Sequence, residues 1–380
     1  MRADGYLDVD RSGVDWLLDP DSPQLRLLGK EISERTPASS CDPAGVLDDL
    51  GLLRVLLRER HMGIAVGRSS AFDVEDVVEA WTRRVHDRRP VTWDAAVGDA
   101  VIQLQEALGD RRTQVLHTSS RPVPRPSQAP DAGPVWEARD VRSGRAAARV
   151  VRVRALTDAA SASRDVAAAV AAADADFAFE RIVVDLRGAM GGDDGPVRSW
   201  AEGRAAAPWP AVRGGSRWAV GPGRTALNVW NYLVFEAVTR PDRAAAALGA
   251  QEHQPRPDDT LHLVFDEPVD APAGPQPWAG RMLVLVDGAT ASAGESSALL
   301  LRDCLGARLV GGRTYGVVEY GAWAPYVLPA SGLVVTLPTE WSEVAEPTDV
   351  VGIKPDLEID VTMAVDDVAR AFDDLWAAAA

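Results

Sequence analysis

Residues 282–295 read Met-Leu-Val-Leu-Val-Asp-Gly-Ala-Thr-Ala-Ser-Ala-Gly-Glu, and this stretch decides the fold class. It begins with a short apolar run, which is typical of a strand buried on both faces of a sheet. Small residues follow and bring Ser292 to the start of a helix predicted over 293–303. A hydroxyl there meets the positive end of the helix dipole, and the N–H of Ala293 can face an oxyanion. Ser292 is therefore a candidate nucleophile, although a serine at a helix start is also a common N-cap.

The flanking sequence continues this alternation of strands and helices. Strand, helix and strand in this order imply parallel pairing with right-handed crossovers, so we predict an α/β fold. Apolar periodicity and turn residues predict further helices over 163–173 and 365–376, strands at 181–186 and 307–310, and hairpins over 135–156 and 326–338.

The N-terminal part of the chain has a different pattern. Residues 1–120 are predicted to form a helical domain, because apolar residues recur there at helical spacing, for example over 74–85 and 92–108. A proline-rich stretch follows at 121–134 and can continue neither a helix nor a strand ladder. We interpret it as a linker to an α/β core over 135–380.

The composition excludes several classes of partner. The 380 residues include 40 Lys and Arg against 56 Asp and Glu, for a formal net charge of −16. Binding to nucleic acid or to an anionic membrane needs clustered basic residues, so we expect neither partner. We identify no signal peptide, and no apolar run approaches the roughly 18–20 residues of a spanning helix. These features predict a cytoplasmic protein, and the sequence leaves self-association into a homo-oligomer open.

The two cysteines, Cys41 and Cys304, are too few for a disulfide framework. Their neighbours have no metal-ligand spacing, so the sequence predicts reduced thiols and no metal site.

The stretch around Ser292 resembles the core of the tail-specific (C-terminal-processing, tricorn-like) serine peptidases. In that family a strand is followed by Thr/Ser-Ala-Ser-Ala-Ser/Gly-Glu and by a helix that ends in Asp, as at 290–295 and Asp303 here. Three further motifs occur in the family's order: Val184-Asp-Leu-Arg-Gly-Ala-Met-Gly-Gly192, Val310-Gly-Gly-Arg-Thr-Tyr-Gly316 and Val351-Gly-Ile-Lys-Pro-Asp-Leu-Glu358. Four motifs in one order make the resemblance specific.

The resemblance implies a ClpP/crotonase-like core of β-β-α units preceded by an N-terminal helical domain. It implies a serine-type peptidase that acts on a peptide or an unfolded protein tail through an acyl-enzyme on Ser292. The N–H groups of Gly191 and Ala293 would form the oxyanion hole, and Thr314 and Tyr315 would contact the substrate. No metal or organic cofactor is required. The chain has no room for the PDZ domain of many relatives, which favours peptides over large proteins as substrates.

The catalytic base is missing from both positions that the family uses. The processing-peptidase branch has a lysine where this chain has Val317, and the tricorn-like branch has a histidine where this chain has Arg112. Neither side chain can take a proton from serine near neutral pH. Asp349 occupies the place of the carboxylate that orients the histidine in the tricorn-like branch. The resemblance therefore provides a nucleophile and an orienting group without a base.

Two histidines are candidates for the base. His117 lies five residues past Arg112 and reaches the same cleft if the chain folds back. His61 resembles a histidine in a Leu-x-x-x-His stretch of the tricorn-like branch, where we regard it as structural. The other three look solvent-exposed or part of a sheet face, and they are His86, His253 and His262.

A second class of function remains open. The same core occurs in binding proteins, such as the retinoid-carrying repeats, that need no base. The alternative is therefore a catalytically dead or repurposed protein that binds a peptide or an apolar small molecule. Trp209 and Trp218 are candidates for lining an apolar substrate cleft, although they could equally pack loops onto the core. For Arg187 and Asp303 we favour structural ion pairs.

Overall fold

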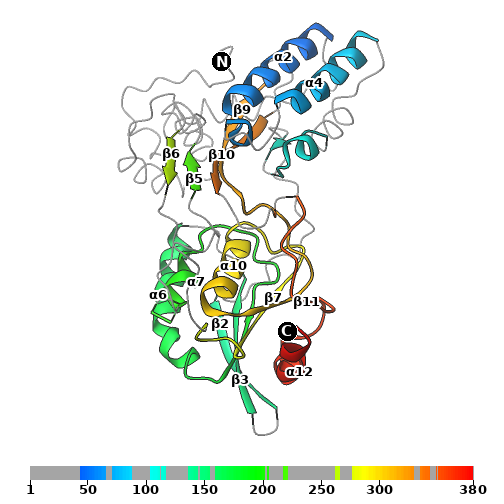
Figure 1. Ribbon diagram of the computed structural model, residues 1–380. Helices are drawn as coiled ribbons and strands as arrows, with labels where there is room; N and C mark the ends of the chain where they lie inside the picture. The colour runs from blue at the N-terminus through cyan, green and yellow to red at the C-terminus, as the bar shows by residue number, and fades with distance from the viewer. Residues whose placement is uncertain are drawn as a thin grey trace, which may run out of the picture. The chain divides into compact units, whose positions relative to one another are not determined.

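The chain folds into two compact units, each built from three separate stretches of sequence (Figure 1). Unit 1 contains 1–126, 218–264 and 320–341, and unit 2 contains 127–217, 265–319 and 342–380. Within these ranges the computed structural model describes residues 43–65, 71–87, 103–111, 113–116, 136–143, 146–154, 159–201, 203–204, 217–220, 262–265, 276–328, 334–342, 348 and 350–379.

Unit 2 is built on a six-stranded sheet with the order β11-β8-β7-β4-β3-β2. All neighbouring strands run parallel except β2 and β3, which form an antiparallel hairpin. The strands are β2 (Trp136–Ser143), β3 (Ala146–Val153), β4 (Arg181–Asp185), β7 (Met282–Val286), β8 (Arg308–Gly311) and β11 (Leu357–Glu358).

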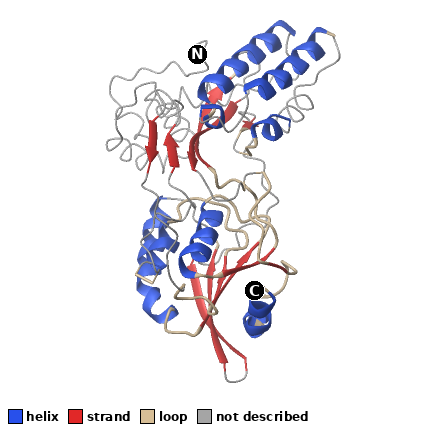
Figure 2. Cartoon of the chain, in the orientation of Figure 1, coloured by secondary structure: helices blue, strands red, loops and turns tan. Residues whose placement is uncertain are grey.

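Helices cover both faces of this sheet (Figures 1 and 2). Side chains alternate along β4, so Ile182 and Val184 face one apolar cluster and Val183 faces another. Both clusters are buried, which explains why the three inner residues of β4 and every residue of β7 are apolar. The first face packs against α6 (Ala159–Asp176), α7 (Gly195–Ala201) and α10 (Ala293–Leu305), and the second against α11 (Val365–Arg370) and α12 (Phe372–Ala378).

The structure confirms most local predictions for unit 2. The predicted strands, the helices over 163–173 and 293–303, and the first hairpin all form, with ends shifted by a few residues. The closing helix differs, because it is interrupted at Ala371 and continues as α12. The α/β fold predicted from the sequence is thus confirmed.

Unit 1 combines helices with a second sheet. The strand order of this sheet is β1-β10-β5-β6. The fifth strand, β9, lies off this path and pairs only with β10 among the described strands. Leucines of the first helix pack with Val335 and Leu337 of β10 in one buried cluster. The elements are α2 (Pro43–Arg60), α3 (Met62–Ala65), α4 (Ala71–His86), a helical segment at 103–108, β1 (Gln114–Leu116), β5 (Arg217–Val220), β6 (His262–Phe265), β9 (Tyr320–Val327) and β10 (Val334–Ser342).

The boundaries of the units differ from the predicted division into 1–120, a linker at 121–134 and 135–380. Residues 114–116 form a strand that pairs with 334–336 of β10, so the N-terminal part is not purely helical. That pairing draws the predicted hairpin over 326–338 into unit 1. The α/β core therefore does not include all of 135–380. The predicted linker itself lies outside the described residues.

Candidate active site

Ser292 lies where the sequence predicted it, at the turn between β7 and α10. It is the N-cap residue of α10 and has φ 54° and ψ −115°. A positive φ is costly for a residue with a side chain and persists only where the surroundings impose it. Such a conformation at the end of a buried strand is typical of a serine that a fold presents for reaction.

The turn after β4 packs directly against Ser292. The Ala291 N–H donates to the Ala189 carbonyl over 2.9 Å. Gly191 has φ 114°, and a Cβ atom there would lie 2.9 Å from the Ser292 Cβ. A Cβ atom on Gly294 would lie 2.2 Å from the Ala189 oxygen. Only glycine fits at these two positions, so the two turns lie in van der Waals contact at the nucleophile.

The amide groups of Gly191 and Ala293 are the predicted oxyanion donors. Among the described residues, neither amide donates a hydrogen bond to another group. Ala293 is the first residue of α10, where an amide has no partner within the helix. Both amides belong to residues that flank Ser292 in space or in sequence, as the predicted oxyanion hole requires.

Glu295 is a fully buried carboxylate one turn into α10. Its Oε2 accepts hydrogen bonds from the N–H groups of Ser292 and Val317, both over 2.9 Å. Its Oε1 accepts from the Thr314 hydroxyl over 2.5 Å and from the Gly316 N–H over 2.8 Å. The carboxylate thus ties the nucleophile turn to the segment that follows β8.

The sequence motifs alone predicted no role for Glu295. Ser292 and Glu295 form the Ser-x-x-Glu pattern of a capping box, in which the glutamate reaches back to the N-cap amide. That pattern could have identified the bond to Ser292. The partners at 314–317 lie too far along the chain for such a pattern to identify.

The structure places Thr314 and Tyr315 beside the nucleophile turn in different ways. The Thr314 side chain is buried, and its hydroxyl accepts the Ile353 N–H over 2.7 Å while donating to Glu295. This geometry favours a positioning role for Thr314 over the predicted substrate contact. The Tyr315 N–H donates to the Thr290 carbonyl over 2.9 Å, and its side chain is half-buried.

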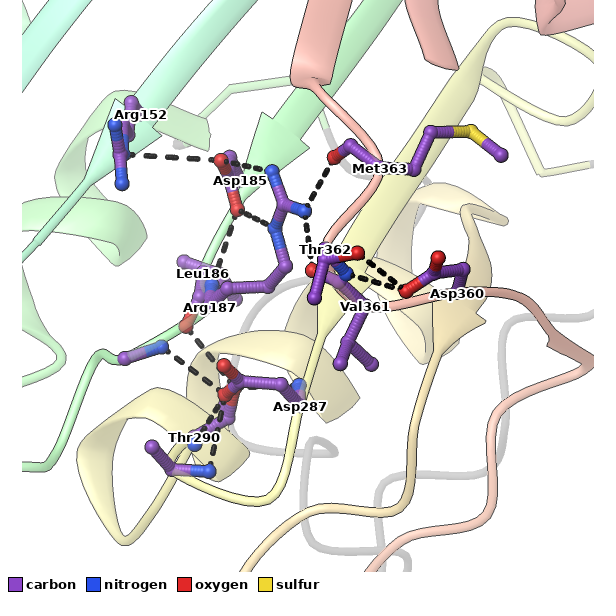
Figure 3. A network of polar contacts seen from close by, with 12 residues as sticks. Arg152, Asp185, Leu186, Arg187, Asp287, Thr290, Asp360, Val361, Thr362 and Met363 are labelled. Carbon is purple, nitrogen blue, oxygen red and sulfur yellow. Dashed lines mark hydrogen bonds and ion pairs between the residues drawn. The ribbon is translucent and has the colours of Figure 1, made fainter. Parts of the chain in front are cut away.

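A polar network holds the carboxyl end of β4 (Figure 3). The Arg187 guanidinium donates to both oxygens of buried Asp185 over 2.8 Å. Its Nη1 donates to the carbonyls of Val361 and Met363 over 2.8 and 2.7 Å. The hydrogen bond to Asp185 raises the pKa of Arg187, although burial opposes the rise. This supports the structural role that we favoured for Arg187.

Asp287 connects the two turns in the same network (Figure 3). Its Oδ1 accepts hydrogen bonds from the N–H groups of Gly188, Ala289 and Thr290 over 2.9–3.0 Å. The Thr290 hydroxyl donates to the Leu186 carbonyl over 3.0 Å. The end of β4 and the end of β7 are therefore held together independently of Ser292.

Val317 occupies the position of the family lysine, and the structure buries it at 4% exposure. Its N–H donates to Glu295, so its backbone is part of the site while its apolar side chain lies in the interior. Unit 2 contains none of the five histidines of the chain, because all of them fall in segments of unit 1.

His61 is fully buried in unit 1, and both ring nitrogens are engaged there. Nδ1 accepts the Gly63 N–H over 3.1 Å, so the ring proton lies on Nε2, which donates to Asp110 over 3.1 Å. Asp110 also accepts from the N–H and the hydroxyl of Thr113. A base needs an accessible unprotonated nitrogen, so this geometry contradicts a catalytic role for His61 and agrees with a structural one.

The remaining predicted site residues cannot be placed. Asp349, His117, Arg112 and Trp209 lie outside the described residues. Trp218 belongs to β5, but its side chain also lies outside them. The residues on either side of Asp349 are described, and the Val350 N–H donates to the Gly316 carbonyl over 3.0 Å. Gly316 in turn donates to Glu295, so Val350 contacts the Glu295 network through Gly316.

Two further predictions concern the far end of α10 and metal binding. Asp303 pairs with Arg302 over 2.8 Å, as expected for a structural ion pair. Cys304 is a buried free thiol. Among the described residues, no cluster of His, Cys, Asp and Glu could hold a metal ion, and no helix is long and apolar enough to cross a membrane.

Comparisons with known proteins find similar folds and one family pattern. The sequence pattern of peptidase family S41 matches residues 231–359, and no curated protein matches the chain. Mature CPAF is similar in structure, with 11% identity, a TM-score of 0.50, and coverage of 88% of this chain and 96% of that chain. CPAF in complex with lactacystin has 10% sequence identity and a TM-score of 0.50, and the match covers 88% of this chain and 97% of that chain. The photosystem II D1 C-terminal processing protease has 14% sequence identity and a TM-score of 0.41, and the match covers 87% of this chain and 98% of that chain.

Proposed function

We propose that this chain is a tail-specific peptidase of family S41, whose sequence pattern matches residues 231–359, and that it cleaves peptides or peptide tails through an acyl-enzyme on Ser292. One observation carries the proposal. Ser292 is held at a positive φ at the start of α10, between two amides that donate no hydrogen bond to a described residue. A serine in this conformation costs stability, and that cost has an explanation if the residue reacts.

The proposed reaction follows from this placement. The Ser292 hydroxyl attacks the carbonyl carbon of the peptide bond, and its proton passes to a base. The N–H groups of Ala293 and Gly191 donate to the oxyanion that develops on the carbonyl oxygen. The amine leaves with a proton, and water then hydrolyses the ester on Ser292. The start of α10 adds favourable dipole interaction with the negative charge.

The base of this reaction is a separate part of the proposal. His61 is committed to Asp110 and Gly63, so we propose His117, oriented by Asp349, in that role.

A second candidate function is favoured by Val317. An apolar, buried side chain at the family's lysine position supports a protein that binds a peptide or an apolar molecule without cleaving it. The two candidates differ in whether the Ser292 hydroxyl is activated, because a binding protein has no use for an activated hydroxyl.

Labelling with a fluorophosphonate decides between them. We expect the folded protein to incorporate one label at Ser292, identified by peptide mass, and the Ser292→Ala variant to incorporate none. Lactacystin, which is bound in one CPAF structure, provides a second probe. Absence of labelling in the folded protein would rule out the peptidase and favour the binding protein. If label attaches, loss of labelling in a His117→Ala variant identifies the base.

A further inference from the structure

We propose that Glu295 is a positioning residue for the reaction of Ser292. The proposal rests on the proposed function, because it describes how the same serine is held for attack. Glu295 does not touch the substrate in this account. Its carboxylate fixes the backbone of the nucleophile turn against the segment 314–317, and so determines which amide of the turn remains available to the oxyanion.

The hydrogen-bonding capacity of the Glu295 carboxylate is saturated. Each oxygen of Glu295 accepts two hydrogen bonds, one pair from Ser292 and Val317 and the other from Thr314 and Gly316. A carboxylate offers about four acceptor sites and no donor, so all of its capacity is used inside the protein. The side chain is 0% exposed, so water cannot replace any of these donors.

Only a carboxylate satisfies this set of donors. Three of the four donors are backbone N–H groups, which cannot reverse their direction. The fourth, the Thr314 hydroxyl, accepts the Ile353 N–H and has its proton directed at Glu295. A glutamine side chain at this position would replace one of the two acceptor oxygens by an NH₂ group. Whichever way the amide is turned, that NH₂ group would point at two of the four donors.

This network is linked to the chemistry of Ser292. Glu295 takes up the Ser292 N–H, so the next amide, that of Ala293, is the one left without an acceptor among the described residues. The φ of 54° at Ser292 needs surroundings that impose it, and the bond from Ser292 to Glu295 is a direct constraint on that backbone. Loosening the carboxylate would therefore move the nucleophile relative to Gly191.

A purely structural role for Glu295 would have a different signature. A helix cap stabilises the fold and affects reactivity only through the fraction of folded protein. A positioning residue changes the rate constant of the folded protein, because a displacement of about 1 Å at a reacting group costs about 100-fold. The two roles separate when labelling rates are compared at equal folded fraction.

The test compares Glu295→Gln with a matched control, Asp176→Asn. Asp176 is another fully buried carboxylate of unit 2 and accepts Arg149 Nε over 2.6 Å and Trp200 Nε1 over 2.8 Å. It lies near the amino end of β4, because Arg149 is in register with Ile182, whereas Ser292 follows the carboxyl end of β7. Both variants replace a buried carboxylate by an amide.

We expect Glu295→Gln to lower the second-order rate of fluorophosphonate labelling at Ser292 about 100-fold in folded protein. Asp176→Asn should stay within about twofold of the unsubstituted protein, even where it lowers the melting temperature as much. On a peptide substrate, Glu295→Gln should lower kcat and leave KM within about threefold, as expected when the turn and not the substrate contacts are disturbed.

Thr314 provides a second variant in case Glu295→Gln does not fold. Thr314→Val removes the hydroxyl at nearly constant volume and should slow labelling about tenfold, the equivalent of one hydrogen bond. Thr314→Ser keeps the hydroxyl and should restore the rate to within about twofold of the unsubstituted protein.

The outcomes separate the two proposals. Equal labelling rates for Glu295→Gln, Thr314→Val and the unsubstituted protein overturn the role of Glu295 and leave the peptidase proposal standing. Equal losses in Glu295→Gln and Asp176→Asn also overturn it, because loss of stability then explains the rate. No labelling of the unsubstituted protein overturns the peptidase proposal, and with it the role of Glu295.

Discussion

Each unit of the protein contains a polar cluster around a fully buried carboxylate, and the two clusters differ in what the carboxylate binds. In unit 1 the His61 cluster (His61, Gly63, Asp110 and Thr113) is closed at the imidazole, because both ring nitrogens are engaged by Gly63 and Asp110. In unit 2 the Glu295 cluster (Ser292, Glu295, Thr314, Gly316 and Val317) ends on the backbone of an unusual serine. Both carboxylates, Asp110 and Glu295, are fully buried.

The difference shows why histidine and carboxylate pairs cannot be interpreted from burial alone. The His61–Asp110 contact has the composition of a catalytic pair, yet its second ring nitrogen is occupied by an amide. The Glu295 cluster contains no histidine, yet it controls the conformation of the candidate nucleophile. The partners of each buried polar group, and not its burial, therefore indicate whether the group can take part in a reaction.

The largest expected effect on stability comes from His61→Ala in the closed cluster. Removing a fully buried imidazole leaves a cavity and takes one donor from buried Asp110, which should cost about 3–5 kcal/mol of unfolding free energy. Urea denaturation measures the loss. The rate of fluorophosphonate labelling per folded molecule should stay within about twofold. A loss of labelling as complete as in Ser292→Ala would instead make His61 the base.

The next effect is expected at the contact between the two turns in unit 2. In Gly294→Ala the new Cβ would lie 2.2 Å from the Ala189 carbonyl oxygen, so one backbone segment must move. We expect a loss of about 2–3 kcal/mol, and slower labelling of Ser292 because the turns separate. Denaturation together with labelling checks both. Unchanged stability would show that the two turns are not in contact.

A smaller effect on stability is expected from Cys304, at the carboxyl end of α10, and it depends on pH. Burial, with a smaller contribution from the negative charge of Asp303, raises the pKa of the Cys304 thiol from its ordinary value of about 9 to about 11. Between about pH 9 and 11 the unfolded chain loses this proton while the folded chain keeps it. The stabilisation is therefore complete below about pH 9 and lost as pH rises through 11, at about 2–3 kcal/mol in total.

Cys304→Ala provides the comparison for this pH dependence. The variant starts from a lower stability because it leaves a small cavity, but its free energy of unfolding should fall less steeply between pH 9 and 11. Parallel curves for the two proteins would contradict the buried, neutral thiol. The reactive end of α10 would be untouched, so labelling of Ser292 at pH 7 should not change.

The smallest effect has the opposite sign. Gly51 lies within α2, and a Cβ atom there meets nothing within 4 Å. Gly51→Ala should stabilise unit 1 by about 0.5–1 kcal/mol, because glycine is a poor helix former. Compared with Gly294→Ala, it shows that the cost at the nucleophile turn comes from contact and not from the loss of a glycine. A destabilising Gly51→Ala would contradict the open space around α2.

The sequence was sufficient for the local structure of unit 2. The apolar runs at β4 and β7 predicted buried strands, and the small residues before Ser292 predicted a turn into a helix. These features depend on neighbours in the chain, which periodicity reports directly. The placement of the Gly191 turn beside Ser292 came instead from the resemblance to the peptidase family.

Long-range contacts were beyond the reach of the sequence. Strand β1 falls in a region with helical periodicity, and it is a strand because it pairs with β10. The role of Glu295 likewise depends on Thr314, Gly316 and Val317, whose amides and hydroxyl converge only in the folded chain. Residue type at single positions could not show this, because a glutamate in the first turn of a helix is ordinary.

The interleaving of the two units has a consequence for biosynthesis. Strand β1 pairs with a strand that lies roughly 220 residues further along the chain, so at about 5–20 residues per second it waits about 10–40 s for its partner on the ribosome. Folding of unit 2 is delayed in a similar way, because α11 and α12 cover one face of its sheet and are synthesised after all of its strands. Neither unit can finish before the other has begun, so nascent chains expose unpaired strand edges for much of their synthesis.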